Sequence, residues 1–186
     1  MLGAVGLVIA GCAGGATKTV TVVRTHTLTT APTTGTTTSA SRPSACSHAQ
    51  LSGTFARVPG SAGAGQIEYR LTLRNTSAST CWLGALPLLA KLLDASGSPL
   101  PTKEVPAVDA VQGTPPATLE PGTTATATVR FSPDVPGPGD SQSGSCQPEA
   151  HTLALTPTGG GTVDVPIQPP TSVCERGTLN FDLLRG

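Results

Sequence analysis

The sequence predicts an all-β fold, an immunoglobulin-like antiparallel β-sandwich with two disulfides. Three observations lead to this prediction. Segments that alternate apolar and polar residues recur after residue 46, and a period of two is typical of a strand with one buried face. The 22 Gly and 18 Pro among 186 residues favour turns and short strands over long helices. The same patterned part of the chain holds four of the five cysteines.

Residues 1–11 are expected to form a signal peptide. Leu2 to Ala10 make an unbroken small and apolar stretch. As a helix rising about 1.5 Å per residue, this stretch would cover less than half of a bilayer core of roughly 30 Å, so it is too short to span a membrane. Gly11 then precedes Cys12, and a small residue before a cysteine at this point resembles the bacterial lipobox.

The lipobox resemblance implies that the signal is cut before Cys12 and that the cysteine sulfur carries a diacylglycerol. Two or more acyl chains hold a protein on a membrane without a spanning helix, because each buried CH₂ contributes about 0.8 kcal/mol. We therefore expect lipidation of Cys12 and a location on the extracytoplasmic face of the cell membrane, in the cell envelope. The alternative is an ordinary frayed N-terminus with an unmodified cysteine.

Residues 12–45 are predicted to be the lipidated cysteine followed by a Thr/Ser/Pro-rich linker. Residues 13–45 hold twelve Thr, and their apolar residues are too few to close a core. Such a segment behaves as a disordered coil with a root-mean-square reach of about 30 Å. We expect it to tether a single domain, residues 46–186, whose length suits one hydrophobic core.

Within this domain the alternation of apolar and polar residues marks the strands. The apolar positions that recur with a period of two are Ile67, Tyr69, Leu71 and Leu73; Ala125, Ala127, Val129 and Phe131; Leu153 and Leu155; Val163, Val165 and Ile167; and Leu179, Phe181 and Leu183. Residues 83–93 could instead be the apolar face of a helix. Pro87 excludes a helix interior there, and Asp94 to Gly97 makes a good hairpin turn, so we predict strands.

The four domain cysteines, Cys46, Cys81, Cys146 and Cys174, are predicted to form two disulfides, because an even number outside the cytoplasm favours oxidation. Three connectivities are open. We favour Cys46 with Cys81 and Cys146 with Cys174, since each pair flanks two successive strands whose antiparallel pairing would bring the cysteines to one end. A metal site is the alternative, but the Cys46 to His48 step lacks a second close Cys or His pair. We expect no metal and no cofactor.

The order of these residues resembles domain-of-unknown-function family 4232, a family of secreted proteins and lipoprotein domains of actinobacteria. The resemblance covers roughly residues 46 to 184 and rests on Cys46, Arg74-Asn75-Thr76-Ser77, Cys81-Trp82-Leu83-Gly84, Pro87, Leu93-Asp94-Ala95-Ser96-Gly97, Leu119-Glu120-Pro121-Gly122, Cys146 and Cys174. The family has no established catalytic residues, so the resemblance implies none here.

The residues themselves suggest structural roles for several of these positions. Asn75 is expected to begin a turn, because its short amide can bond the local backbone. Gly97 and Gly122 are expected to close hairpin turns at positive φ. Trp82, next to a cysteine, is predicted to pack on the disulfide in the core, with a surface-exposed binding aromatic as the alternative.

Catalytic and nucleic-acid functions find little support in the sequence. Gly139-Asp140-Ser141 is similar to the serine motif of some hydrolases, but it stands in a Pro- and Gly-rich loop without a strand-to-helix elbow. Nothing in the sequence places His48 or His151 near it as a base. Eleven basic residues balance eleven acidic ones and aromatics are 3%, which argues against nucleic-acid binding.

We therefore expect a non-enzymatic, membrane-anchored extracytoplasmic lipoprotein that serves as a binding or cell-envelope structural module. Its expected partners are the membrane, through the lipid anchor, and an envelope protein or glycan whose identity the sequence does not give. The alternative function is an envelope serine hydrolase that uses the Gly139-Asp140-Ser141 loop.

Overall fold

The structure is a computed structural model that describes residues 42–85, 89–106 and 115–186. The predicted signal peptide, Cys12, the linker up to residue 41 and Pro87 lie outside these ranges. The predictions made for them therefore stay predictions. No helix within the described ranges is long and apolar enough to cross a membrane.

The regular secondary structure of the described domain is almost entirely β-strand, which confirms the predicted fold class. The strands are β1 (Ser44–Ala45), β2 (Leu51–Arg57), β3 (Ile67–Asn75), β4 (Cys81–Leu83), β5 (Ala90–Leu93), β6 (Lys103–Pro106), β7 (Ala117–Leu119), β8 (Thr124–Phe131), β9 (Glu149–Leu155), β10 (Val163–Ser172) and β11 (Thr178–Phe181). The helical elements among the described residues are one 3-10 turn, η1 (His48–Gln50), and one short turn, α1 (Cys174–Gly177).

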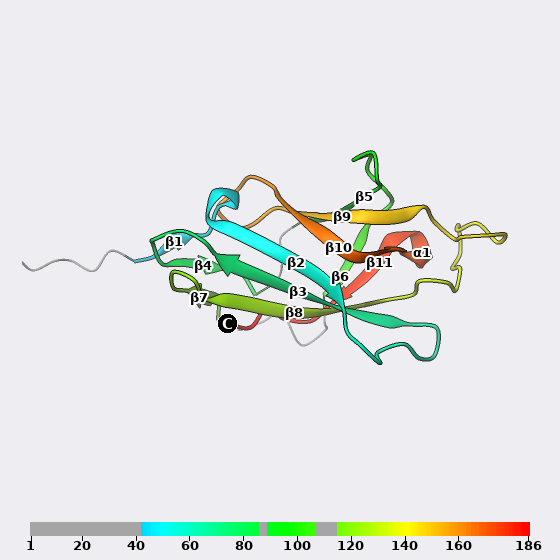
Figure 1. Cartoon of the computed structure of the whole chain (residues 1–186), viewed down its shortest axis with the longest axis horizontal. Helices are drawn as coiled ribbons and strands as arrows, with labels where there is room; N and C mark the ends of the chain where they lie inside the picture. Colours follow the sequence, from blue (N-terminus) through cyan, green and yellow to red (C-terminus); the bar gives the residue numbers. More distant parts are fainter. Residues whose placement is uncertain (1–41, 86–88, 107–114) are drawn as a thin grey trace, which may run out of the picture. The chain divides into compact units, whose positions relative to one another are not determined.

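These strands form two sheets (Figure 1). The larger sheet has the order β5-β9-β10-β2-β3-β8-β11-β6, and the smaller has the order β1-β4-β7. Most neighbours are antiparallel, but β1 with β4, β10 with β2 and β11 with β6 are parallel pairs. The parallel pairs arise because β1, β6 and β10 reach their partners through long connections and not through hairpins.

The two edge strands of the larger sheet are tied to each other, so the sandwich approaches a closed barrel. The backbone N–H of Ala90 in β5 donates to the carboxylate of Glu104 in β6. The N–H of Leu92 donates to Thr102 Oγ1 at 2.9 Å, and the N–H of Leu100 donates to the Leu92 carbonyl at 2.8 Å. These bonds satisfy backbone groups that an open sheet edge would leave unpaired.

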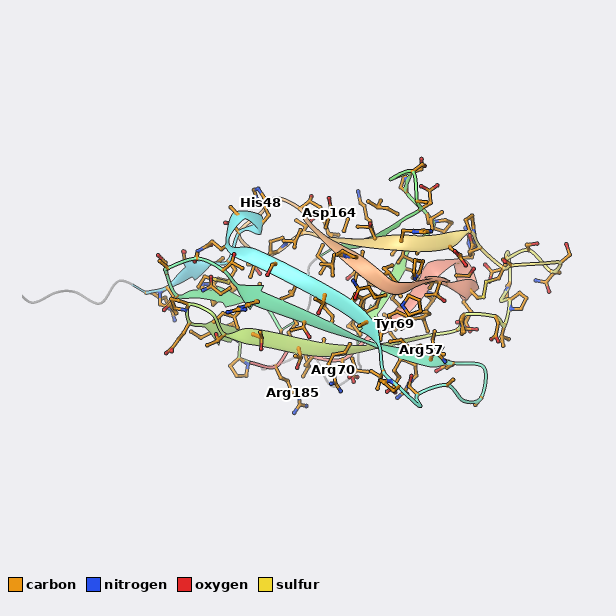
Figure 2. The ribbon with its side chains drawn as sticks, in the orientation of Figure 1. His48, Arg57, Tyr69, Arg70, Asp164 and Arg185 are labelled. Atoms are coloured by element: carbon orange, nitrogen blue, oxygen red, sulfur yellow. A yellow bond between two sulfur atoms is a disulfide. The ribbon has the colours of Figure 1, made fainter. Side chains whose placement is uncertain are left out.

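The core lies between the inward faces of the strands, as the period-two pattern predicts. In β3 the residues Ile67, Tyr69, Leu71 and Leu73 are all buried. The Tyr69 ring packs on two phenylalanines, with ring centroids 5.1 Å from Phe55 and 5.2 Å from Phe131. Tyr69, labelled in Figure 2, donates its hydroxyl to the Pro169 carbonyl at 2.8 Å.

The favoured disulfide connectivity is confirmed. Cys46 is bonded to Cys81, with a Cα–Cα distance of 4.9 Å, and Cys146 to Cys174, with 5.4 Å. The second pair lies at one end of an antiparallel hairpin, as the order of the strands predicted. The register of the β9–β10 hairpin sets Glu149 opposite Ser172, and the two cysteines flank this end.

Three expectations about single residues need correction. Trp82 is only half-buried while its neighbours in β4 are buried, so it lies on the strand face opposite the disulfide and not in the core. Leu183 falls outside β11, which ends at Phe181, and it is Leu184 that is buried. Gly122 does have positive φ, but its turn joins β7 to β8, which belong to different sheets, so it closes no hairpin.

The turn predicted after β5 is confirmed. The N–H of Gly97 donates to the Asp94 carbonyl at 3.0 Å, and Gly97 has a φ of 80°. Leu93 then pairs with Pro99 in an antiparallel bridge, which completes a short hairpin. Glycine is favoured here because positive φ strains residues that carry a Cβ.

Candidate functional site

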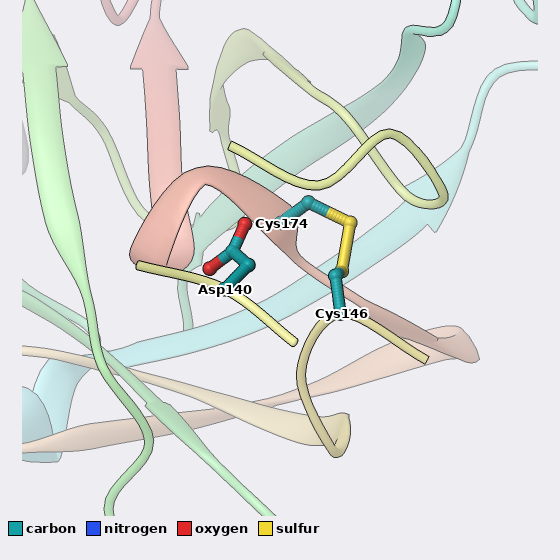
Figure 3. A group of neighbouring side chains, drawn as sticks. All are labelled: Asp140, Cys146 and Cys174. Atoms are coloured by element: carbon teal, nitrogen blue, oxygen red, sulfur yellow. A yellow bond between two sulfur atoms is a disulfide. The ribbon is translucent and has the colours of Figure 1, made fainter. Parts of the chain in front are cut away.

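Hydrogen-bond donors surround the carboxylate of Asp140, which lies beside the Cys146–Cys174 disulfide (Figure 3). The side chain is buried and accepts four hydrogen bonds. Its Oδ2 accepts from the backbone N–H of Gly137 at 2.8 Å and from that of Glu175. Its Oδ1 accepts from the backbone N–H of Arg176 at 2.9 Å and from Gln147 Nε2 at 2.8 Å. The carboxylate thus joins two segments that are far apart in the sequence.

The segment that Asp140 holds is a left-handed turn within α1. Glu175 has φ 55° and ψ 41°, and Arg176 has φ 59° and ψ 39°. Gly177 continues the turn with φ 74°. Left-handed backbone costs roughly 1–2 kcal/mol for each residue with a Cβ, so two such residues in succession need support from their surroundings.

That support comes from three sides. The Asp140 carboxylate bonds both strained N–H groups, and the Cys146 disulfide fixes Cys174 at the start of the turn. Gly177 closes the turn against the backbone of Pro101, where an added Cβ would lie 1.8 Å from the carbonyl oxygen. The turn is therefore held by a charge, a covalent bond and close packing at once.

The surroundings of Asp140 favour its ionised form. Burial alone would raise the pKa of this carboxyl, but the hydrogen bonds from Gln147 and from the N–H groups of Gly137, Arg176 and Glu175 outweigh it and lower the pKa to about 2. Hydrogen bonds donated to a carboxylate stabilise the charged state. Asp140 is thus an anion, and its charge stabilises the turn by accepting hydrogen bonds from the backbone.

The same side chains could be mistaken for a metal site. The ligand atoms of Asp140, Cys146 and Cys174 lie within 4.8 Å of one another. The two sulfurs are joined to each other, however, and a disulfide offers no thiolate for a metal. The carboxylate oxygens face N–H donors, which repel a cation. This group stabilises the turn and does not fit a metal ion.

A groove of about 640 Å³ lies beside this turn. It is lined by Pro101, Thr102, Lys103, Gly137, Pro138, Glu175, Arg176 and Thr178, and we name it the Arg176 groove. Lys103 of β6 is the register partner of Thr178 in β11, so both strands contribute to its wall. Two exposed cations, Lys103 and Arg176, and one exposed carboxylate, Glu175, stand at this groove.

The Pro- and Gly-rich loop before Asp140 packs closely on the turn. A Cβ added at Gly137 would lie 2.9 Å from Cγ and 3.1 Å from Cα of Glu175. A Cβ at Gly139 would lie 3.2 Å from Cδ of Arg176. Small residues at these two positions let the loop and the turn approach each other, and together they shape the groove.

The structure does not assemble a serine-hydrolase site around Ser141. Ser141 is exposed, and its Oγ donates to the Ser143 carbonyl at 2.7 Å. Among the described histidines, His151 has its Nε2 3.9 Å from Glu149, and the imidazole of His48 packs over Gly161. In the described part of the chain, no contact joins Ser141 to either of them.

The sequence did not reveal the groove. Asp140 stands in a Pro- and Gly-rich loop, and Lys103 and Arg176 stand far from it and from each other in the chain. The one signal was the Gly-rich spacing before Asp140 together with Gly177 directly after Glu175 and Arg176. Such spacing indicates close backbone approach but does not say to which segment.

Comparison with known proteins gives one match. The family model described as "Domain of unknown function (DUF4232)" matches residues 46–182. No curated protein and no solved structure matches the chain.

Proposed function

Because the chain belongs to DUF4232, a family of domains of unknown function, we propose its role from its own geometry: a non-enzymatic, lipid-anchored binding module of the cell envelope. In this proposal the Arg176 groove is the ligand site. The linker holds the domain away from the extracytoplasmic membrane surface, to which Cys12 is attached.

The observation that carries the binding role is the strained turn at the groove. Two successive left-handed residues, Glu175 and Arg176, are costly, and they are held in place by the Asp140 carboxylate and a disulfide. Backbone strain that its surroundings over-determine is typical of ligand sites, because a rigid cradle loses little entropy on binding. The strained residues here are also the ones whose side chains line the groove.

The side chains of the groove suggest an anionic ligand of small size. Arg176 and Lys103 supply two cations against the single carboxylate of Glu175, and guanidinium and ammonium groups form charge-assisted hydrogen bonds to carboxylates and phosphates. A volume of about 640 Å³ falls in the range of ordinary ligand pockets, roughly 300–1,000 Å³. Pro101 and Pro138 add apolar surface on which a sugar ring could pack.

Titration of the full chain with glucuronate, followed by amide NMR shifts, tests the groove. We expect shifts at residues 175–178 with glucuronate and none with the neutral sugar glucose. Lys103→Gln and Arg176→Gln should each remove this response, and Arg57→Gln, a substitution of an exposed arginine outside the groove, should keep it. If glucuronate and inorganic phosphate both leave the groove signals unchanged, the ligand site is not this groove.

The anchoring part of the proposal rests on the lipobox resemblance and has its own test. Cys12→Ser, or treatment of cells with globomycin, should prevent signal cleavage and move the mature protein out of the membrane fraction. The intact mass of the mature protein should include the diacylglycerol. A protein of unmodified mass that is released into the medium would instead be a secreted domain without lipid.

The serine-hydrolase alternative is tested separately. A fluorophosphonate probe should leave the wild-type protein unlabelled, because Ser141 Oγ is engaged with a backbone carbonyl and no described base contacts it. Labelling that disappears in Ser141→Ala would establish the hydrolase and end the non-enzymatic proposal.

A further inference from the structure

A second surface, on the outer side of the larger sheet, carries a regular array of arginines and threonines. It is formed by outward-facing residues of β2, β3, β8 and the C-terminal segment. We name it the arginine–threonine face and define it by Thr54, Arg70, Thr72, Arg74, Thr124, Thr126, Thr128 and Arg185. Arg70 and Arg185 project from the lower side of the domain in Figure 2.

Strand register places these side chains in rows. Thr54 lies opposite Thr72, Thr72 opposite Thr126, and Thr126 opposite Arg185, so one row crosses four adjacent segments. On one side of this row Arg74 pairs with Thr124, and on the other Arg70 pairs with Thr128. Neighbouring rows are about 6.7 Å apart and neighbouring strands about 4.8 Å apart. Three arginines therefore surround the hydroxyls of Thr72 and Thr126.

The arginine–threonine face is cationic, whereas the domain as a whole has more acidic than basic residues. Residues 46–186 contain eight Lys or Arg and eleven Asp or Glu. Among the described residues Glu68 pairs with Arg130, whose Nε donates at 3.1 Å, and Glu149 lies 3.9 Å from His151 Nε2. Arg70, Arg74 and Arg185 have no carboxylate partner within the described ranges, so their charges are available.

Two acids border the face on one side. Glu68 is the register partner of Arg130, and the N–H of Asp182 donates to the Thr128 carbonyl. Both attract Arg130 and raise its pKa, and the hydrogen bond that Arg130 donates to Glu68 is the largest cause. Glu68 and Asp182 thus lie near Arg130 at one end of the array. The other three arginines extend away from it.

The shape and chemistry of the face select its occupant. The defining residues are spread over four adjacent segments of the sheet surface, so the face suits an extended chain better than an enclosed small molecule. Hydroxyl groups between the arginines can bond to sugar hydroxyls, and each guanidinium can bind a carboxylate or phosphate through two N–H groups. The defining residues include no aromatic side chain on which bases could stack, which argues against a nucleic acid.

We propose that the arginine–threonine face binds an extended anionic glycan, a polysaccharide that bears carboxylate or phosphodiester groups. Arg70, Arg74 and Arg185 bind its charged groups, and the threonine row bonds its hydroxyls. This site is separate from the Arg176 groove and does not depend on it. It places the domain on an acidic polymer while the groove stays open.

Binding of the purified full-length protein to immobilised polygalacturonate tests this proposal, with dextran as the uncharged polymer. We expect binding to polygalacturonate that weakens as salt rises, and none to dextran. The double variant Arg70→Gln/Arg74→Gln and the single variant Arg185→Gln should each weaken binding, by about tenfold for each arginine removed. Thr72→Val/Thr126→Val should weaken it less, since these hydroxyls form neutral hydrogen bonds.

Matched controls separate this face from other cationic sites. Arg57→Gln removes an exposed arginine of β2 outside the face, and Lys91→Gln removes an exposed lysine of β5 that lies outside both the face and the groove; both should bind like wild type. The proposal is overturned if wild type does not bind polygalacturonate, or if these controls weaken binding as much as the face variants. It is also overturned if the protein binds vesicles containing phosphatidylglycerol but not the polymer, because the occupant would then be a membrane surface.

Discussion

The carboxylate of Asp140 accepts a 2.9 Å hydrogen bond from the backbone N–H of Arg176, which stands 36 positions later in the chain. This contact joins a Pro- and Gly-rich loop to a left-handed turn, and the Cys146–Cys174 disulfide joins the same two segments covalently. The shape of the Arg176 groove beside them therefore depends on both the charge of Asp140 and the Cys146–Cys174 disulfide.

Asp140→Asn should lower the stability of the domain and loosen the turn. The amide of Asn carries a donor NH₂ in place of one acceptor oxygen, so it would face at least one backbone N–H, of Gly137, Glu175 or Arg176, without a hydrogen bond. We expect a lower thermal midpoint and shifted amide signals for residues 175–177. Asp134→Asn, at an exposed position nearby, should change neither.

Asp140 should also make the domain less stable in acid. Its folded pKa of about 2 lies below the unfolded value of roughly 3.9. A carboxyl with a depressed pKa stabilises the fold above the unfolded pKa, and this contribution is lost as pH falls from about 4 to about 2. Denaturant unfolding across this range should show a smaller loss for Asp140→Asn than for wild type. Parallel losses would mean that the charge of Asp140 is not stabilising.

The two disulfides should differ in what they support. Replacing either pair by serines should cost about 3 to 4 kcal/mol of unfolding free energy, because the closed loops, with sequence separations of 35 and 28, are similar in length. Removing Cys146 and Cys174 should in addition abolish the glucuronate response of the groove, whereas removing Cys46 and Cys81 should spare it in the folded protein. Urea unfolding and the same NMR titration measure both effects.

Asn75→Ala should destabilise the domain by about 2 to 4 kcal/mol. The Asn75 side chain is fully buried, donates to the carbonyls of Ser79 at 2.8 Å and Leu119 at 3.0 Å, and accepts from the N–H of Ser77 at 3.0 Å. Alanine would leave these groups without partners. Asn75→Asp keeps the acceptor but loses both donated bonds, so it should also destabilise at neutral pH and recover partly in acid, where the protonated carboxyl can donate. Urea unfolding of the three proteins at pH 4 and 7 tests this.

The expected role of Asn75 at the start of a turn is confirmed, but the side chain also makes a bond that the sequence does not predict. Its bonds to Ser77 and Ser79 are local and follow from the residue type. The bond to Leu119 joins β3 to the smaller sheet across 44 positions, and no local pattern predicts it. The strands and the disulfides could be predicted because both depend on patterns within or directly beside each strand. One-sided burial gives the alternation of apolar and polar residues, and the cysteines stand next to hairpin ends.

The Arg176 groove could not be predicted for the same reason. Glu and Arg show no preference for left-handed backbone, so the sequence around Glu175 does not reveal the turn. The turn exists because Asp140 reaches it from another loop. The arginine–threonine face could be predicted in part. The alternation of residues predicted which side chains of β3 and β8 point outward, but only the structure shows that Arg185 lies opposite Thr126.

Glu104→Gln should stabilise the domain at neutral pH. Burial raises the pKa of this carboxyl, although the N–H of Ala90 partly offsets the rise by donating to it. A carboxyl with a raised folded pKa stabilises the fold below its unfolded value of about 4.3, and the contribution is lost as pH rises through the folded pKa. Gln keeps an oxygen that can accept from Ala90 across the edge between β5 and β6, and it carries no charge that burial would penalise.

The gain from Glu104→Gln should therefore be small near pH 4 and grow toward pH 7, in urea unfolding of variant and wild type side by side. Glu104→Ala is the matched control: it removes the charge but also the acceptor of the Ala90 N–H, so it should be less stable than the Gln variant at every pH. A Gln variant that is less stable than wild type at pH 7 would show that the ionised carboxylate, and not merely an acceptor, holds the two sheet edges together.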